Sequence, residues 1–502
     1  MVTRHREELA AGRSVSEAVL TTVRTAGRTV LFSALTVLLS LSALLVFPLY
    51  FLRSFAYAGI AAVVFAALGA LVVLPAALAG LGSRIDRLDL RRPLRRLLRL
   101  PAPRPASLDT GFWSRIAHAV MRRPWPIGTA VVLLLVLAAT PFSQVQFGLP
   151  DDRVLPRDSP AHTVTETLRQ EFPGRETLAL SVVVPETGGA RDLDVSSYAL
   201  ALSQLDGVER VDAATGSFSR GQQLVQAGPA SSRFTAGGGT FLSVVPSVEP
   251  YSPGGEELVR ELRALDSPLG PVLVDGQAAE LVDTKAALAK DIPLALGLIV
   301  VATFVLLFLF TGSVIIPLKA LVLNLLSLCA TFGAMVWVFQ QGHLTWLIGD
   351  PVVTGTLDTT IPLLMFCVLF GLSMDYEVFL LSRIREVYLA TGDNARAVAV
   401  GLQRTGRIVT AAAGLLAIVF LAFVTSDIAF IKLLGLGTAL AILVDATLVR
   451  GALVPAFMRL AGDANWWAPR PLRRLHDRIG LRESGEPSGA MVATDRREPA
   501  GV

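Results

Sequence analysis

The sequence is poor in charge, in lysine and in cysteine. Only 17% of its 502 residues are charged, and lysine occurs four times, so arginine supplies nearly all of the positive charge. The two cysteines, Cys329 and Cys367, lie inside long apolar runs, where they cannot crosslink an external domain and have no metal-ligand spacing. We interpret them as small apolar packing residues. A disulfide-stapled secreted fold is therefore excluded.

Motifs of the common enzyme classes are also absent. No Gly-Lys-Ser/Thr follows a glycine-rich loop, which excludes a P-loop ATP site. Residues 371–375 resemble the start of a nucleophile elbow but lack the final glycine and lie in an apolar run. None of the five histidines has a second metal ligand at a typical spacing. We therefore expect no enzyme activity, no metal and no cofactor.

Long apolar runs dominate what is present. Hydrophobic residues make up 52% of the chain, and a run of about 18 or more can cross the hydrocarbon core as a helix. Eight runs qualify: Val30–Phe47, Phe55–Leu81, Trp125–Phe142, Ile292–Phe310, Val314–Phe339, Thr359–Leu381, Ile408–Val424 and Phe430–Met458. The sequence thus predicts an α-helical polytopic membrane protein with about eight transmembrane helices.

Arginine-rich loops predict the orientation. They lie between spans two and three, between spans six and seven, and after the last span, whereas 340–357 has neither Lys nor Arg. Cytoplasmic loops are the basic ones. With an even number of spans, we expect both termini in the cytoplasm of a bacterial cell and a multi-pass protein of its inner (plasma) membrane.

These signals divide the chain into seven parts. We expect a cytoplasmic segment 1–29, two spans in 30–81, a basic cytoplasmic linker 82–124, a span 125–142, an external domain 143–290, five spans in 291–458, and a disordered basic tail 459–502. The first 29 residues are polar, unlike a cleavable signal peptide. The linker is either a solvated connector or, over Leu81–Arg104, a basic segment lying on anionic lipid. Nucleic-acid binding is not expected, since no binding module accompanies the arginines.

The segment 143–290 alternates strand-like and helical patterns. Strands are expected at Thr177–Val184, Val208–Asp212, Thr240–Val245 and Pro271–Val274, and helices at Ser196–Leu205 and Gly255–Leu265. This β-α-β-β-α-β order is that of a ferredoxin-like unit. The fold class is therefore a helical membrane protein with one external α/β ferredoxin-like domain.

The chain also contains an internal repeat. Residues 3–7 (Thr-Arg-His-Arg-Glu) match 382–386 (Ser-Arg-Ile-Arg-Glu) at an offset of 379, and Pro75 matches Pro455 at an offset of 380. Each copy leads into two spans in the same orientation, a parallel repeat as found in secondary transporters. Because the second copy follows a domain and several spans that the first lacks, we expect a truncated or split first half, or a start assigned too late.

Ionisable residues within spans are candidates for function, because burying them costs about 2.5–3.5 kcal/mol on insertion scales. Asp375 and Tyr376 lie in the sixth span. Desolvation disfavours a charged carboxylate, so Asp375 can carry a proton with Tyr376 as hydrogen-bonding partner. The alternative is a buried polar contact that locks helices together. Ser373, Glu377 and Asp445 are possible supporting polar residues. Glu377 is either part of the relay or one partner of a salt bridge. Asp445 is either part of the relay or a structural partner of Arg450.

The run 371–386 (Gly-Leu-Ser-Met-Asp-Tyr-Glu-Val-Phe-Leu-Leu-Ser-Arg-Ile-Arg-Glu) closely resembles the second-half signature of the MMPL family, in the resistance–nodulation–division (RND) superfamily. The resemblance runs through nearly all of residues 1–460. It implies export of lipids, lipid-linked molecules or amphipathic drugs, driven by proton influx, with Asp375 and Tyr376 as the second Asp-Tyr pair of the relay. The first pair has no matching position.

Two functions from different classes remain open. In the first, the chain is a proton-driven exporter that acts with membrane lipids, an amphipathic substrate and a separate first-half chain or further copies of itself. In the second, it is a scaffold or inactive remnant whose external domain binds a partner. Asp375 favours the exporter, and the absent first-half Asp-Tyr pair favours the remnant.

Overall fold

A computed structural model describes the chain except for residues 83–110, 173, 187–191, 350–351 and 480–502. Among these described residues, eight helical segments are long and apolar enough to cross a membrane: Val15–Val46, Tyr50–Leu81, Pro124–Gln144, Gln277–Thr311, Ile315–Gln340, Ile361–Thr391, Asn394–Thr425 and Ala429–Trp466. All eight predicted spans are confirmed. They are longer than the apolar runs because helical hydrogen bonding continues through polar turns at the membrane surface.

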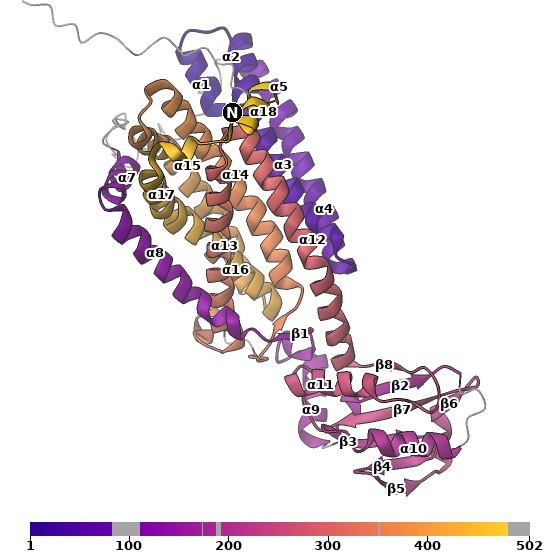
Figure 1. The fold of residues 1–502 in the computed structure, drawn as a ribbon. Helices are drawn as coiled ribbons and strands as arrows, with labels where there is room; N and C mark the ends of the chain where they lie inside the picture. The colour runs from indigo at the N-terminus through magenta and orange to yellow at the C-terminus, as the bar shows by residue number, and fades with distance from the viewer. Residues whose placement is uncertain (83–110, 173, 187–191, 350–351, 480–502) are drawn as a thin grey trace, which may run out of the picture.

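The helices form one bundle with an α/β domain at one end (Figure 1). The bundle contains α1 (Val2–Ala10), α2 (Val15–Thr22), α3 (Arg28–Ser42), α4 (Tyr50–Leu68), α5 (Leu74–Leu81), α7 (Phe112–Arg122), α8 (Pro124–Ala139), α12 (Gln277–Thr311), α13 (Ile315–Met335), α14 (Ile361–Thr391), α15 (Asn394–Ala422), α16 (Ala429–Val444), α17 (Val454–Ala461) and α18 (Arg470–Ile479). Helix α3 packs beside α12 and α14, and α8 packs on α13. The core of the bundle is centred on α13, α14 and α16.

The α/β domain has the predicted ferredoxin-like order. Its main elements are β2 (Leu180–Val184), α10 (Asp192–Leu202), β3 (Val208–Ala213), β7 (Gly239–Pro246), α11 (Pro253–Ala264) and β8 (Leu273–Asp275). The four strands pair antiparallel in the order β3-β7-β2-β8. Alternate residues of β2 are buried, as expected for a sheet with one face on helices.

Three features of this domain were not predicted. A hairpin, β4 (Gly216–Ser219) and β5 (Gln222–Gln226), extends the sheet beyond β3, and β6 (Thr235–Ala236) pairs with β7. Helix α9 (Pro160–Glu171) precedes the unit. All five residues of β5 are exposed, so the apolar alternation that identifies a half-buried strand is missing from its sequence.

The domain is joined to the bundle at two places. Helix α12 begins directly after β8 and continues for 35 residues through the membrane span, so domain and bundle share one helix. Strand β1 (Phe147–Gly148) pairs in parallel with β9 (Leu357–Asp358), just before α14. The predicted boundary at residue 291 therefore lies inside a continuous helix, where the sequence changes from polar to apolar.

The internal repeat appears in the helix ends. Helix α2 is capped by Ser14 and α15 by Asp393, and α4 begins at Tyr50 while α16 begins at Ala429, each pair at an offset of 379. Pro75 and Pro455 each follow a π-helical stretch, Gly69–Val73 and Asp445–Leu453. Both copies end in a glycine with nearly the same backbone angles, Gly82 and Gly462.

Part of the predicted disordered tail is helical. Helix α18 places the side chain of His476 against the ring of Phe308 in α12. Residues 480–502 and the stretch 83–110 of the basic linker, with most of its proposed amphipathic segment, lie outside the described residues. The remainder of the linker contains α7, which packs against α15.

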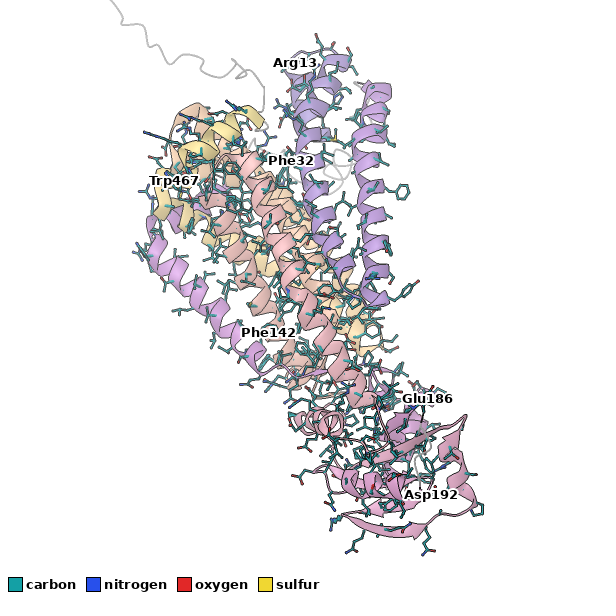
Figure 2. All side chains as sticks on the ribbon, turned by 45° about the vertical axis from the view of Figure 1, so that its right-hand side comes forward. Arg13, Phe32, Phe142, Glu186, Asp192 and Trp467 are labelled. Carbon is teal, nitrogen blue, oxygen red and sulfur yellow. The ribbon has the colours of Figure 1, made fainter. Side chains whose placement is uncertain are left out.

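The two ends of the bundle differ. The N-terminus and α18 lie at the end away from the α/β domain (Figure 1). Figure 2 shows Arg13 and Trp467 at that far end and Phe142 towards the domain. The structure thus places the first described residue and α18 on one side of the bundle, and the α/β domain on the other.

Candidate functional site

The candidate site lies halfway along α14, where this helix is closest to α3. A Cβ atom added to Gly371 would lie 3.2 Å from the Cα of Val37 and 3.3 Å from the Cβ of Ser40. The hydroxyl of Ser40 donates a hydrogen bond of 2.6 Å to the carbonyl of Cys367. Small residues at such a crossing let two helix backbones approach closely. The glycine therefore brings α3 within reach of Asp375, one turn further along α14.

Asp375 is held by a residue from the first repeat. The hydroxyl of Ser33 on α3 donates a hydrogen bond to Oδ1 of Asp375. Both side chains are only partly buried. Sequence reasoning missed Ser33, because a lone serine in an apolar span carries no signal until the opposing helix is known.

Asp445 and Arg450 form a buried ion pair beside α14. Nη2 of Arg450 lies 2.6 Å from Oδ2 of Asp445 and donates another hydrogen bond, also of 2.6 Å, to the carbonyl of Ser373. The Ser373 hydroxyl donates to the same Asp445 oxygen at 3.0 Å. A charged pair that is removed from water needs such additional hydrogen bonds to offset its desolvation.

The π-helical form of Asp445–Leu453 explains this pairing. Residues five apart point to different sides of an α-helix with 3.6 residues per turn. In a π-helical stretch, hydrogen bonds run between residues i and i+5, which brings such side chains onto one side. From the sequence, Asp445 could be either a relay residue or a structural partner of Arg450. The structure shows that Asp445 and Arg450 are in contact.

Tyr376 contacts this ion pair through its ring. The guanidinium carbon of Arg450 lies 5.0 Å from the centre of the Tyr376 ring, within the range of a cation–π contact. Arg450 thus touches Tyr376, Asp445 and the backbone of Ser373, and links α14 to the last span. The hydrogen bond of Tyr376 to Asp375 stays a prediction, and the contact that the structure adds is that of the Tyr376 ring with Arg450.

Glu377 forms a separate buried ion pair. Its Oε1 lies 3.1 Å from Nζ of Lys319 on α13, and the two side chains are 10% and 1% exposed. Of the two interpretations of Glu377, the structure favours the salt bridge. Lys319 was not predicted to be a partner of Glu377. The chain has only four lysines, so a lysine inside a span could have been recognised from the sequence as a candidate partner.

A small cavity lies between these groups. It has a volume of about 20 Å³, enough for one water molecule. Its polar lining comes from three helical segments, α13, α14 and the π-helical stretch of the last span: Asn324, Ser327, Ser373, Tyr376, Asp445 and Arg450. Nδ2 of Asn324 is buried and has no hydrogen-bond partner among the described residues. A water molecule bound here would have several polar partners.

The chemistry available to this arrangement follows from the residue types. Asp445 is paired with the guanidinium of Arg450, whereas the hydrogen bond to Asp375 comes from the uncharged hydroxyl of Ser33. The described residues contain no group of three or more His, Cys, Asp or Glu side chains that would hold a metal ion. The site is suited to moving protons between carboxylates, hydroxyls and a water molecule.

Comparison with known proteins gives the family. The model of the MMPL family matches residues 1–127 and 153–486. The chain belongs to the MMPL family. It is 41% identical to a membrane protein of Streptomyces coelicolor, over 96% of this chain and 63% of that protein. It is also 35% identical to the trehalose monomycolate exporter MmpL3 of Mycolicibacterium smegmatis, over 100% of this chain and 51% of MmpL3.

Another relative, membrane protein YdfJ of Bacillus subtilis, is 30% identical over 95% of this chain and 62% of its own length. This MMPL chain therefore spans between 51% and 63% of the length of these three relatives. Membership of the family, the eight spans and the α/β domain together make it a multi-pass membrane protein of the RND superfamily.

Proposed function

We propose that this MMPL chain is part of a proton-driven exporter of lipids, lipid-linked molecules or other amphipathic compounds across the bacterial inner membrane. The observation that carries the proposal is Asp375, a carboxylate in mid-membrane held by the Ser33 hydroxyl of the other repeat. Protonation and deprotonation of Asp375 change the contact between α3 and α14. In this proposal, the uptake and release of a proton by Asp375 is coupled to a movement of one repeat against the other.

The neighbouring groups have supporting roles in this proposal. Arg450 pairs with Asp445 and holds Ser373 and Tyr376 in place, while a water molecule in the small cavity passes the proton along. The pair of Glu377 and Lys319 is a structural anchor between α13 and α14. The lipid class of the substrate is supported by the exporter MmpL3, whose name gives trehalose monomycolate, a glycolipid, as its cargo.

The arrangement in the membrane is also part of the proposal. The arginine-rich loops favour both ends of the chain in the cytoplasm, and the α/β domain lies at the opposite end of the bundle. Because the chain spans about half the length of MmpL3, we propose that transport needs helices beyond these 502 residues. The scaffold alternative keeps the domain as a binding module and assigns no role to Asp375.

The test is a chromosomal substitution in the native host, where any other required chain is present. Asp375→Asn keeps the size of the side chain and can still accept the Ser33 hydrogen bond, but it cannot ionise. Mass spectrometry of surface lipids should show the profile of a gene deletion, with the protein present at wild-type level in the membrane. Glu386→Gln, an exposed acid at the far end of the same helix, is the matched control and should resemble wild type.

Two outcomes would count against the proposal. A wild-type lipid profile for Asp375→Asn would remove the proton-carrying role and leave Asp375 as a packing residue. A deletion that changes neither surface lipids nor resistance to amphipathic drugs would favour the scaffold.

A further inference from the structure

Helix α18 has two sides of different character. Leu472, Leu475 and His476 share one side of the helix, where Leu472 is half-buried and His476 is buried. The other side carries exposed arginines: Arg470, Arg473, Arg474 and Arg478. Among the described residues, none of these four arginines has an ion-pair partner. Asp477 is the one acid of α18, so the helix presents a strongly basic surface.

The side with His476 fixes α18 at the end of a membrane span. The His476 ring packs edge-on against the ring of Phe308 in α12, with 6.0 Å between the ring centres. A Cβ atom added to Gly312, directly after α12, would lie 2.9 Å from Cδ2 of His476, so the glycine lets α18 come this close. Nε2 of His476 also lies 3.4 Å from Nη2 of Arg385 on α14. Helix α18 therefore lies beside the last turn of α12, where this span reaches the membrane surface.

The loop before α18 is bound to the same span end. The backbone N–H of Val314 and the hydroxyl of Ser313 donate hydrogen bonds of 3.1 and 3.4 Å to the carbonyl of Trp467. Figure 2 shows Trp467 at the end of the bundle away from the α/β domain. The side chains of Trp467 and Leu475 are 55% and 43% exposed. Tryptophan is enriched at membrane–water interfaces, where its ring lies at the level of the headgroups. Exposed apolar side chains and unpaired arginines thus occur together at headgroup depth.

We propose that α18 is a binding surface for the anionic headgroups of the lipid leaflet at this end of the bundle. The inference rests on the proposed orientation, in which this end faces the cytoplasm, and goes beyond the proposed function in naming a lipid partner. Guanidinium groups bind phosphate oxygens through paired hydrogen bonds. The basic side of α18 contacts the phosphates, while Leu475 and Trp467 enter the boundary between headgroups and acyl chains.

The depth of α18 favours lipid over a soluble acidic partner. A nucleic acid or an acidic protein would neutralise the arginines but would leave Leu475 and Trp467 in water, whereas an anionic leaflet satisfies both. His476 lies against α12 and Arg385, so a lipid-bound α18 would also hold the ends of α12 and α14 together. Because α14 carries Asp375, the lipid would act on the helix of the candidate site.

Fluorescence of the full chain in lipid vesicles tests this inference. A nitrobenzoxadiazole dye is attached to Leu475→Cys, and the protein is placed in vesicles of phosphatidylcholine or of equal parts phosphatidylcholine and phosphatidylglycerol. Brominated acyl chains should quench the dye several-fold more strongly in the anionic vesicles. The difference should disappear in about 1 M salt, where charges are screened beyond about 3 Å. The unmodified chain gives the background labelling of the native cysteines.

Two sets of variants serve as controls. Leu389, near the end of α14, is 73% exposed, and a dye on Leu389→Cys should be quenched equally in both vesicles. Replacing Arg473, Arg474 and Arg478 together by Gln should abolish the dependence on phosphatidylglycerol at Leu475, whereas replacing them by Lys should keep most of it. Because these arginines are exposed, both triple variants should elute from size-exclusion chromatography as the unmodified chain does.

Several outcomes would overturn the inference. Equal quenching of the Leu475 dye in both vesicles would mean that α18 lies on lipid through its apolar residues alone, and no quenching in either would mean that it faces water. A response to glycerol phosphate in detergent as large as the response to vesicles would assign the arginines to a soluble phosphate. None of these measurements depends on transport, so Asp375→Asn should leave them unchanged even if the proposed relay fails.

Discussion

At the scale of single residues, the buried ion pair of Asp445 and Arg450 has a direct consequence for stability. Arg450 is 4% exposed and Asp445 9%, and each satisfies the other's charge. Removing one partner of a buried pair leaves an uncompensated charge, whereas replacing both with neutral residues of similar size is often harmless. Arg450 is therefore needed as the partner of the Asp445 carboxyl group, and Asp445 is needed as the partner of the Arg450 guanidinium.

This gives a prediction for two variants. Arg450→Met should lower the free energy of unfolding by about 3–5 kcal/mol, because the Asp445 carboxylate loses its cation. The double variant Asp445→Asn with Arg450→Met should recover most of that loss. Thermal melts in detergent, followed by size-exclusion chromatography with fluorescence detection, measure both. Equal destabilisation by the single and double variants would mean that the guanidinium matters for packing on Tyr376 and not for charge.

At the scale of elements, glycines mark where helices cross most closely. A Cβ added to Gly333 of α13 would lie 2.0 Å from the carbonyl oxygen of Ala138 in α8, so α8 would have to move. On α12, a Cβ added to Gly297 would meet nothing within 4 Å. Both glycines lie inside helices that span the membrane, which makes them a matched pair.

Gly333→Ala should therefore lower stability by about 1–3 kcal/mol, the usual cost of overpacking a tight contact. Gly297→Ala should be neutral, or should stabilise by up to about 1 kcal/mol, since alanine is the better helix former. Melting temperatures of the two purified variants in one detergent test this. A Gly333→Ala protein as stable as wild type would show that α8 can shift away from α13 at little cost.

At the scale of the whole molecule, the α/β domain lies at one end of the bundle, and the N-terminus and α18 lie at the other (Figure 1), so we expect them on opposite sides of the membrane. Glu209 on β3 and Leu389 near the end of α14 are both exposed. The arginine-rich loops favour the Leu389 end in the cytoplasm. The native Cys329 and Cys367 lie within spans, and Cys367 is buried, which makes the unmodified protein a low background for labelling.

We predict that Glu209→Cys reacts with a membrane-impermeant thiol reagent on intact spheroplasts and that Leu389→Cys reacts only after the membrane is opened. Gel shifts of the affinity-purified protein measure the labelling, with the unmodified chain as control. Labelling of Leu389→Cys from outside would reverse the orientation. Labelling of both from outside would contradict the three spans that lie between Glu209 and Leu389.

Much of this molecule follows from its sequence alone, because the membrane imposes strong local rules. Eight apolar runs gave eight spans, since backbone groups in lipid must be satisfied within a helix. The order of strands and helices in 143–290 predicted the ferredoxin-like unit, and the repeat seen in the sequence recurs in the structure as helix caps at an offset of 379. Asp375 and Asp445 were identifiable because an acid within an apolar run is costly wherever the helix lies.

Only the tertiary structure decided which groups meet. Ser33 reaches Asp375 across 342 positions of sequence, and Lys319 reaches Glu377 because α13 packs on α14. The contact between Asp445 and Arg450, five residues apart, required a π-helical stretch, and the periodicity of the side chains does not predict such a stretch. Periodicity and composition describe one helix at a time, whereas contacts between helices depend on their crossing geometry.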